Sequence, residues 1–391
     1  MKLPGPTESR AHLAYCTNIH PAESWADTRH ALATHTLAVR DLLRESGHLA
    51  GDAPFAIGLR LSATAAAGLL AGDELPRFRD WLEETGTYVF TINGFPYGDF
   101  HGTRVKERVF QPDWTDPARL AYTKNLFRIL ASIAPADTGA SVSTLPGSFK
   151  AFGAEESLIR ANLIELAGFI DDLSASSGRD FHLGLEPEPL GHFENSVETV
   201  AFFDRLRHHA ADAEAINRRI GVNYDACHFA LQYESAESAL GLLSMAGIRL
   251  SKIHLSSALA FSPADPAAIA AIRGFEEPTY FHQVLLREPN GEIARYQDLP
   301  DFLAEIDTGN LNPARFDEAR VHFHIPLDAE PAPPLSSTRD HAAATLAWHR
   351  QHPQACQHFE IETYTWGVLP GGMQRPVAEQ IAAEYRWALG S

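Results

Sequence analysis

The chain has 391 residues and a formal net charge of −18, a field that repels nucleic acid and anionic membrane surfaces and leaves a small molecule as the expected partner. It contains no apolar run of about 18 residues and no apolar leader, so neither a membrane span nor a secretory signal is expected. Its three scattered cysteines do not form a disulfide framework, which favours reduced thiols in a cytoplasmic protein.

Short apolar runs alternate with helical patterns along the chain. The runs predicted to be strands are, in chain order, His12–Ile19, Phe55–Leu61, Thr87–Asn93, Ala140–Leu145, Phe181–Glu186, Ile220–Asp225, Leu250–Leu255, Arg320–Pro326 and His358–Thr363. Alternation of this kind favours a parallel sheet, and eight such units close into a (β/α)8 TIM barrel. We therefore predict a single barrel domain over residues 1–391.

Nine candidate strands compete for the eight places of such a barrel. The irregular part of the pattern lies at about residues 258–319, where Thr279–Arg287 and Glu292–Gln297 flank Pro289, Asn290 and Gly291. Two extended runs around a turn of this composition predict a β-hairpin. We expect this region to be an insertion, with Arg320–Pro326 either an extra strand or a replacement for another.

Side chains on a strand alternate between its two faces, and this alternation separates polar from apolar residues in five of the candidate strands. In His358–Thr363, for example, Glu360 and Glu362 oppose Phe359 and Ile361. Because helices cover the outside of a barrel, the apolar face must point outward and the polar face into the lumen. The last inward residues are expected at the carboxyl-terminal mouth, where barrel active sites lie, and they are Glu186, Asp225, His254 and Glu362.

Charged groups buried singly in the lumen would cost several kcal/mol each, so they must pair with one another or bind an ion. An internal salt-bridge network, such as Lys252 with Glu360, explains the deeper polar layer but not the strand ends. Three carboxylates and one imidazole suit one divalent ion, such as Mn²⁺, Mg²⁺, Co²⁺ or Zn²⁺, with open positions for substrate oxygens. The predicted metal ligands are Glu186, Asp225, His254 and Glu362.

From about residue 140 to the end, the order of these motifs resembles the xylose isomerase-like superfamily, which includes ketose 3-epimerases, hydroxypyruvate isomerases and AP endonuclease IV. The motifs are Leu185-Glu186-Pro187-Glu188-Pro189, Asp225-Ala226-Cys227-His228, Ile253-His254-Leu255 and Glu360-Ile361-Glu362. Four phrases look like the EboE-type metabolite-traffic branch of that superfamily, namely Tyr15–Pro21, Leu185–Pro189, His322–Leu327 and Glu362–Trp366.

In the epimerases the two metal-bound glutamates act as acid and base on opposite faces of the sugar carbon, and the resemblance implies this catalytic role for Glu186 and Glu362. His228, three residues after Asp225, matches the histidine that contacts substrate there or binds a further zinc in the endonuclease-like members. The epimerases also carry an arginine shortly after the metal histidine, whereas the run Ser256–Ala260 has none. This departure argues against a sugar 3-epimerase reaction.

Other residues near the predicted mouth are candidate substrate contacts. The spacing to Glu194 favours Glu188 as the strand-end metal ligand, whereas the strand register favours Glu186, because prolines on both sides place Glu188 in a loop. The aromatic loop 94–102 is either a lid or ordinary packing on the barrel rim. His322 and His324 either contact substrate or belong to a hydrogen-bonded lumen. The candidate substrate contacts are His228, His324, His322, Glu188, His20 and Trp366.

Three functions remain open at this point. The first is a metal-dependent isomerase or epimerase-like enzyme that transfers a proton next to a metal-bound carbonyl of a small hydroxylated metabolite. The second is a non-catalytic, carrier-type metabolite-traffic protein that uses the same metal pocket without turnover. The third is a zinc phosphodiesterase of the AP endonuclease IV type, against which the net charge of −18 argues. Retention of both glutamates favours the first function, and the missing arginine favours the second.

Overall fold

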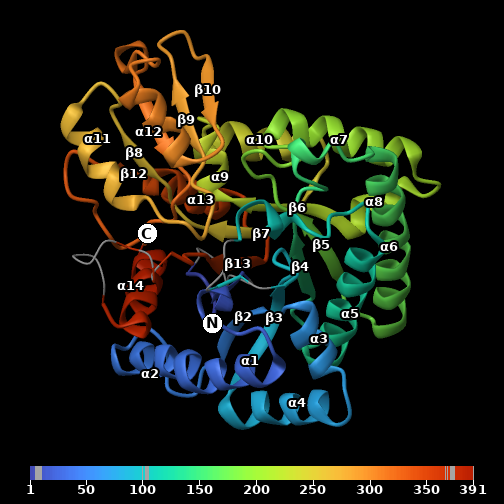
Figure 1. The fold of residues 1–391 in the computed structure, drawn as a ribbon. Coiled ribbons are helices and arrows are strands. Elements are labelled where there is room, and N and C mark those ends of the chain that lie inside the picture. The colour runs from blue at the N-terminus through green and yellow to red at the C-terminus, as the bar shows by residue number, and fades with distance from the viewer. Residues whose placement is uncertain are drawn as a thin grey trace.

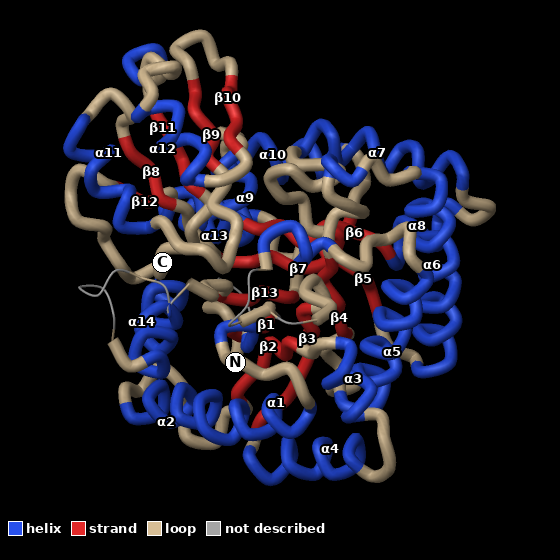
Figure 2. The backbone as a smooth tube through the Cα atoms, viewed as in Figure 1, coloured by secondary structure: helices blue, strands red, loops and turns tan. Residues whose placement is uncertain are grey.

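The computed structural model describes residues 1–4, 11–98, 100–101, 105–365, 367, 369 and 375–390. Within these residues an eight-stranded parallel sheet forms a (β/α)8 TIM barrel, which confirms the predicted fold class. Figure 1 shows the helices arranged around the strands, and Figure 2 shows the strands gathered at the centre of the molecule. A second, smaller group of strands lies at the upper left of both views.

The barrel strands follow one another around the barrel in chain order. They are β1 (His12–Tyr15), β2 (Phe55–Arg60), β3 (Thr87–Asn93), β4 (Ala140–Thr144), β5 (Phe181–Leu185), β6 (Ile220–Asp225), β7 (Arg249–Leu255) and β13 (His358–Ile361). Neighbouring strands pair in parallel from β2 through β7 to β13 and then β1, and a parallel bridge between Cys16 and Gly58 joins β1 to β2. All carboxyl ends therefore meet at one mouth.

Helices cover the outer, apolar face of these strands. The first, α1 (Trp25–Ala31), continues through a π-helical turn at Leu32–Thr36 into α2 (Leu37–Glu45). The others around the barrel are α3 (Ala63–Leu69), α4 (Glu74–Thr85), α5 (Pro117–Ile133), α6 (Glu156–Ser177), α7 (Ser196–His209), α8 (Ala213–Arg219), α9 (Ala226–Leu231), α10 (Ala236–Met245), α13 (Arg339–Gln351) and α14 (Val377–Gly390). None of the helices described here is long and apolar enough to cross a membrane.

Helix ends follow local sequence chemistry. The side chain of Asp116 caps α5 by accepting a hydrogen bond from the backbone of Ala118, and Pro117 occupies the first helical position. Gly86 and Gly178 end α4 and α6 in the left-handed conformation, which glycine adopts without steric cost.

An insertion with its own sheet lies between β7 and β13. Its strands are β8 (Leu259–Phe261), β9 (Val284–Arg287), β10 (Ile293–Tyr296), β11 (Glu318–Val321) and β12 (Ser336–Ser337), accompanied by α11 (Pro266–Ile272) and α12 (Leu299–Asp307). The predicted hairpin is confirmed, since β9 and β10 pair antiparallel. The sheet extends beyond residue 319, because β12 pairs with β8 across a long sequence separation that local patterns do not reveal.

The candidate strand Arg320–Pro326 proves to be the extra one. Strand β11 ends at Val321 and pairs with β8 and β9 of the insertion, so the barrel does not use it. The following residues have no strand pairing; instead, the backbone N–H groups of His322 and Ile325 donate to the carbonyls of Gln283 and Ser257. These bonds direct the segment across the barrel mouth.

Candidate metal centre

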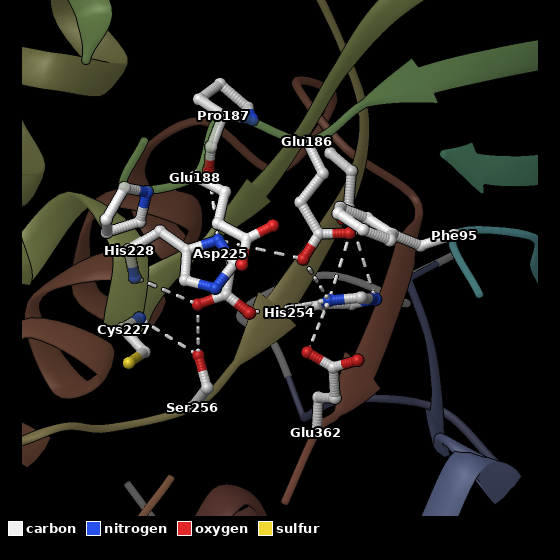
Figure 3. A network of polar contacts seen from close by, with 12 residues as sticks. Phe95, Glu186, Pro187, Glu188, Asp225, Cys227, His228, His254, Ser256 and Glu362 are labelled. Atoms are coloured by element: carbon white, nitrogen blue, oxygen red, sulfur yellow. Dashed lines mark hydrogen bonds and ion pairs between the residues drawn. The ribbon is translucent and has the colours of Figure 1, made fainter. Parts of the chain in front are cut away.

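The four predicted ligands converge at the carboxyl-terminal mouth of the barrel, each from a different strand. Glu186 follows β5 directly, Asp225 ends β6, His254 is the penultimate residue of β7, and Glu362 follows β13. All four side chains are buried, and each contributes a nitrogen or oxygen atom to a group whose members lie within 4.8 Å of one another. Figure 3 shows the three carboxylates arranged around the imidazole of His254.

The imidazole of His254 has two different surroundings. Its Nε2 lies 2.9 Å from Oε2 of Glu360, in the deeper layer, and Lys252 donates to the same oxygen at 2.6 Å. Because a carboxylate only accepts, Nε2 carries the hydrogen in the neutral ring. The lone pair of Nδ1 then points at the three outer carboxylates, at 3.1 Å from Glu362, 3.4 Å from Glu186 and 3.5 Å from Asp225.

This arrangement requires a positive charge at its centre. Burial alone would lower the pKa of His254, but Glu362 and Glu186 outweigh burial and raise it well above the ordinary value. A proton on Nδ1 neutralises only part of the charge of three carboxylates, and the buried Oδ2 of Asp225 has no hydrogen-bond partner. Three oxygen donors and one imidazole nitrogen fit a divalent cation, which would take the place of that proton.

Amide and hydroxyl groups fix the orientation of the carboxylates. Asn18 and Asn93 donate to Oε1 of Glu362 at 2.9 and 3.2 Å. Asn223 donates to Oε2 of Glu186 at 2.8 Å, and Ser256 donates to Oδ1 of Asp225 at 2.6 Å. Because these bonds engage one oxygen of each carboxylate, the other oxygen is left to face His254, where a cation would bind.

Sequence reasoning did not assign a role to Asn18 or Asn93. A signal was available for Asn93, because it is the last residue of a predicted barrel strand, the same position that Asp225 occupies on its own strand. Asn18 lies in a short 3-10 helix after β1, and no local pattern connects it with Glu362, which lies 344 positions away.

Three histidines form a second group beside the first. The Nδ1 atoms of His228, His322 and His324 each face a carbonyl-type oxygen, at 2.9, 2.7 and 2.7 Å, provided by Pro187, Gln283 and Glu362. With Nδ1 donating, the three Nε2 lone pairs face one another, at 3.1 Å between His228 and His322 and 3.3 Å between His322 and His324. The groups here that could hold a further cation each join two of these histidines with one other residue, which is Glu188, Asp225 or Cys227.

Glu188 belongs to the histidine group rather than to the carboxylate group. Its carboxylate lies within 4.8 Å of ligand atoms of His228 and His322, whereas Glu186 is the glutamate beside His254. Burial, opposed by His228 and reinforced by Glu186, raises the pKa of Glu188 to about 8. The geometry thus favours Glu186, the choice of the strand register, over Glu188, the choice of the spacing to Glu194, as the candidate metal ligand.

A cavity lies over both groups. Its polar lining residues include Asn18, Asn93, Glu186, Glu188, His228, His322 and Glu362. Its apolar lining residues include Phe95, Pro96, Phe100, Val105, Val109, Tyr280, Phe281 and Tyr364. Parts of the predicted lid loop 94–102 therefore contact the cavity, although Asp99 and Gly102 lie outside the described residues.

Of the predicted substrate contacts, His324 and His20 are not among the residues that line this cavity, whereas His322, two positions before His324, is. His20 is buried away from the cavity, with its Nε2 at 2.9 Å from the hydroxyl of Tyr15 and its ring stacked on His35. His20 follows the 3-10 turn that replaces the end of the predicted first strand, which changes the direction of its side chain. Trp366 lies outside the described residues.

Comparison with known proteins finds similarity at the level of fold. No protein-family model and no curated protein matches the chain. Similar solved structures include a zinc-bound IOLI protein, at 10% identity over 97% of this chain and 95% of that chain with a TM-score of 0.45. The probable 3-DHS dehydratase AsbF of Bacillus anthracis matches at 12% identity over 96% and 97% of the two chains, with a TM-score of 0.42.

A D-psicose 3-epimerase solved in the presence of D-fructose matches at 16% identity, over 62% of this chain and 72% of that chain, with a TM-score of 0.37. These structures are barrels of the xylose isomerase-like kind that the motifs resemble. At these identities and TM-scores the similarity concerns the fold and assigns no activity or residue role to this chain. The resemblance to the EboE-type branch stays a prediction.

Proposed function

We propose that this protein is a metal-dependent enzyme that transfers a proton at a carbon next to a carbonyl group of a small hydroxylated metabolite. The observation that carries the proposal is the group formed by Glu186, Asp225, His254 and Glu362 under a cavity that two of its glutamates line. A divalent cation held there would polarise a substrate carbonyl and acidify the neighbouring C–H bond.

The two glutamates approach the cavity from different sides. Glu186 comes from β5 and Glu362 from β13, two strands that β6 and β7 separate, and Figure 3 shows them on either side of His254. Burial raises the pKa of Glu362, although His254 opposes this effect, so its carboxyl group retains a proton at higher pH than an exposed one. We assign proton abstraction and return to this pair.

A carrier without turnover is the second candidate. Lys106 is the one lysine among the described residues that line the cavity, and its side chain is already paired with Asp298. No described lining residue is an arginine that could hold an anionic intermediate.

A zinc phosphodiesterase is the third candidate. The groups that join two histidines with Glu188, Asp225 or Cys227 favour it, since two adjacent cations can clamp a phosphoester. The net charge of −18 opposes nucleic acid binding.

Hydrogen exchange tests the proposal. The metal-loaded protein is incubated in deuterated water with α-hydroxy ketones such as hydroxyacetone, and carbon-bound deuterium is measured by NMR. We expect exchange that falls about 10²–10⁴-fold in Glu186→Gln and Glu362→Gln, each measured with enough added metal to restore the wild-type metal content, because each change removes a base and keeps the size of the side chain. Exchange at the full rate in both variants would rule out the assigned role, and binding without exchange would favour the carrier.

A further inference from the structure

The cavity is lined by two kinds of residue, polar and apolar. The carboxylate and histidine groups form the polar wall, with Glu186, His228 and Glu362 among the residues that face the cavity. The apolar part of the lining, which we call the apolar wall, includes Phe95, Phe100, Val109, Tyr280 and Phe281. Of these, the four aromatic residues are nearly buried, with exposed fractions of only 6–8%.

Three segments that are remote in the sequence build the apolar wall. Phe95 follows β3, Val109 lies in a 3-10 helix at Lys106–Phe110, and Tyr280 and Phe281 belong to the insertion. The insertion is bonded to the 3-10 helix, because the backbone N–H groups of Val105 and Lys106 donate to the carbonyl of Thr279 at 2.8 and 3.2 Å. The insertion therefore helps to build the apolar wall.

Aromatic contacts make the apolar wall continuous. The ring of Tyr280 lies 5.3 Å from that of Phe100 and 5.1 Å from that of Tyr364, measured between centroids. Phe281 stacks on Phe149 at 5.9 Å. Rings supported on their outer sides in this way present a preformed surface to a flat group.

Lys106 also lines the cavity, but its ammonium group is not available to a ligand. Lys106 pairs with Oδ2 of Asp298, whose Oδ1 accepts from the backbone N–H groups of His282 and Leu299, both at 3.0 Å. The amides of Asn18 and Asn93 are likewise engaged by Glu362. A sugar with several hydroxyl groups beyond its carbonyl would bury them against Phe and Val side chains, at a cost in lost hydrogen bonds to water.

We infer that the ligand of this cavity is an α-hydroxy ketone with a flat apolar end, such as an aryl group, and that the Tyr280–Phe281 segment of the insertion selects it. The polar end faces Glu186 and Glu362, and the apolar end lies against the apolar wall, where its removal from water favours binding. The hydroxy ketone end of the ligand rests on the proposed function, whereas its apolar end is inferred from the residues of the apolar wall.

Two ketones that share one polar end test the inference. Hydroxyacetone carries a methyl group where 2-hydroxyacetophenone carries a phenyl ring. Their dissociation constants for the Co²⁺-loaded protein are measured from the change in cobalt absorption. We expect the aryl ketone to bind at least about tenfold more tightly, because of the extra apolar surface that it buries.

Variants of the apolar wall locate the preference. Phe281→Ala should reduce the preference for the aryl ketone over hydroxyacetone about tenfold, with the cobalt content measured alongside. Val109→Thr, which keeps the side-chain volume and adds a hydroxyl, should act in the same direction if Phe281→Ala does not fold. Leu158→Ala is the control, since Leu158 lies on α6 and is 47% exposed.

The outcomes separate this inference from the proposed function. Equal affinity for the two ketones would overturn the inference that the ligand has an apolar end, and so would a preference that both wall variants leave unchanged. In either case the proposed function would stand. No spectral change with either ketone in a protein that holds cobalt would overturn both.

Discussion

His254 lies between an outer group of carboxylates and an inner ion pair, so its two ring nitrogens make different contacts. Glu360 holds the hydrogen on Nε2, and Lys252 balances the charge of Glu360. Although burial alone would raise the pKa of Glu360, Lys252 and His254 lower it to about 2, so this carboxylate stays ionised. The ion pair predicted for the deeper layer and the candidate metal site at the strand ends thus lie in two adjacent layers, with His254 between them.

The metal site can be tested one ligand at a time. We expect the protein purified with Mn²⁺, Co²⁺ or Zn²⁺ to lose about one equivalent of metal in His254→Ala and in Glu362→Gln, because each change removes one of four donors. Plasma mass spectrometry after dialysis measures this. His30→Ala, which removes an exposed histidine, is the control. Variants that retain the wild-type metal content would refute the ligand assignment.

At the scale of the elements, strand β2 passes directly beside the inner ion pair. A Cβ atom added at Gly58 would lie 1.9 Å from Oε1 of Glu360 and 2.5 Å from the carbonyl oxygen of Tyr15. No side chain fits between β2 and Glu360 at this point. The glycine therefore makes room for the carboxylate that orients His254.

Gly58→Ala should consequently disturb both stability and metal binding. We expect a loss of roughly 1–3 kcal/mol in the free energy of unfolding from overpacking, together with weaker metal binding as Glu360 moves away from His254. Urea unfolding of the metal-free protein and competition with a chelator measure the two effects. Gly51→Ala, where an added Cβ meets no atom within 4 Å, should change neither. A Gly58→Ala variant with unchanged metal affinity would contradict the role of Glu360 in orienting His254 for metal binding.

At the scale of the whole molecule, the C-terminal helix α14 holds together two segments that reach the barrel mouth. Oε1 of Glu384 accepts from the backbone N–H of Leu327 at 3.0 Å and from the hydroxyl of Thr363 at 2.7 Å. Leu327 follows the segment of His322 and His324, and Thr363 follows Glu362. Burial, opposed by the hydrogen bond from Thr363, raises the pKa of Glu384 to about 8.

This buried carboxyl group predicts a pH dependence of stability. The folded state holds the proton up to about pH 8, whereas the unfolded state releases it near its ordinary pKa of 4.5. The contribution of the protonated Glu384 to the free energy of unfolding is therefore complete below pH 4.5. It is lost as the pH rises to 8, by at most about 1.4 kcal/mol per pH unit. Glu384→Gln should lose less stability than the wild type between pH 5 and 8 in urea unfolding. Exposed Glu379→Gln on the same helix is the control, and identical slopes would contradict the prediction.

The sequence alone determined the barrel and the four residues that meet at its mouth. Strand residues alternate with a period of two, and parallel strands bring all their carboxyl ends to one side, so the last inward residues of four strands must converge. This argument needs no knowledge of which strands are neighbours. It therefore succeeds for Glu186, Asp225, His254 and Glu362, whose role as ligands stays a prediction.

Only the tertiary structure decided what surrounds that group. The bonds of Asn18 and Asn93 to Glu362, the convergence of three Nε2 atoms, and the position of Tyr280 over the cavity all join segments far apart in the chain. Local patterns do not encode such pairs, because a residue's rotamer and the path of its loop depend on the partners it meets after folding. For the same reason alternation alone did not decide whether Arg320–Pro326 was an extra strand or a barrel strand; the pairing of β11 with the insertion shows that it is the extra one.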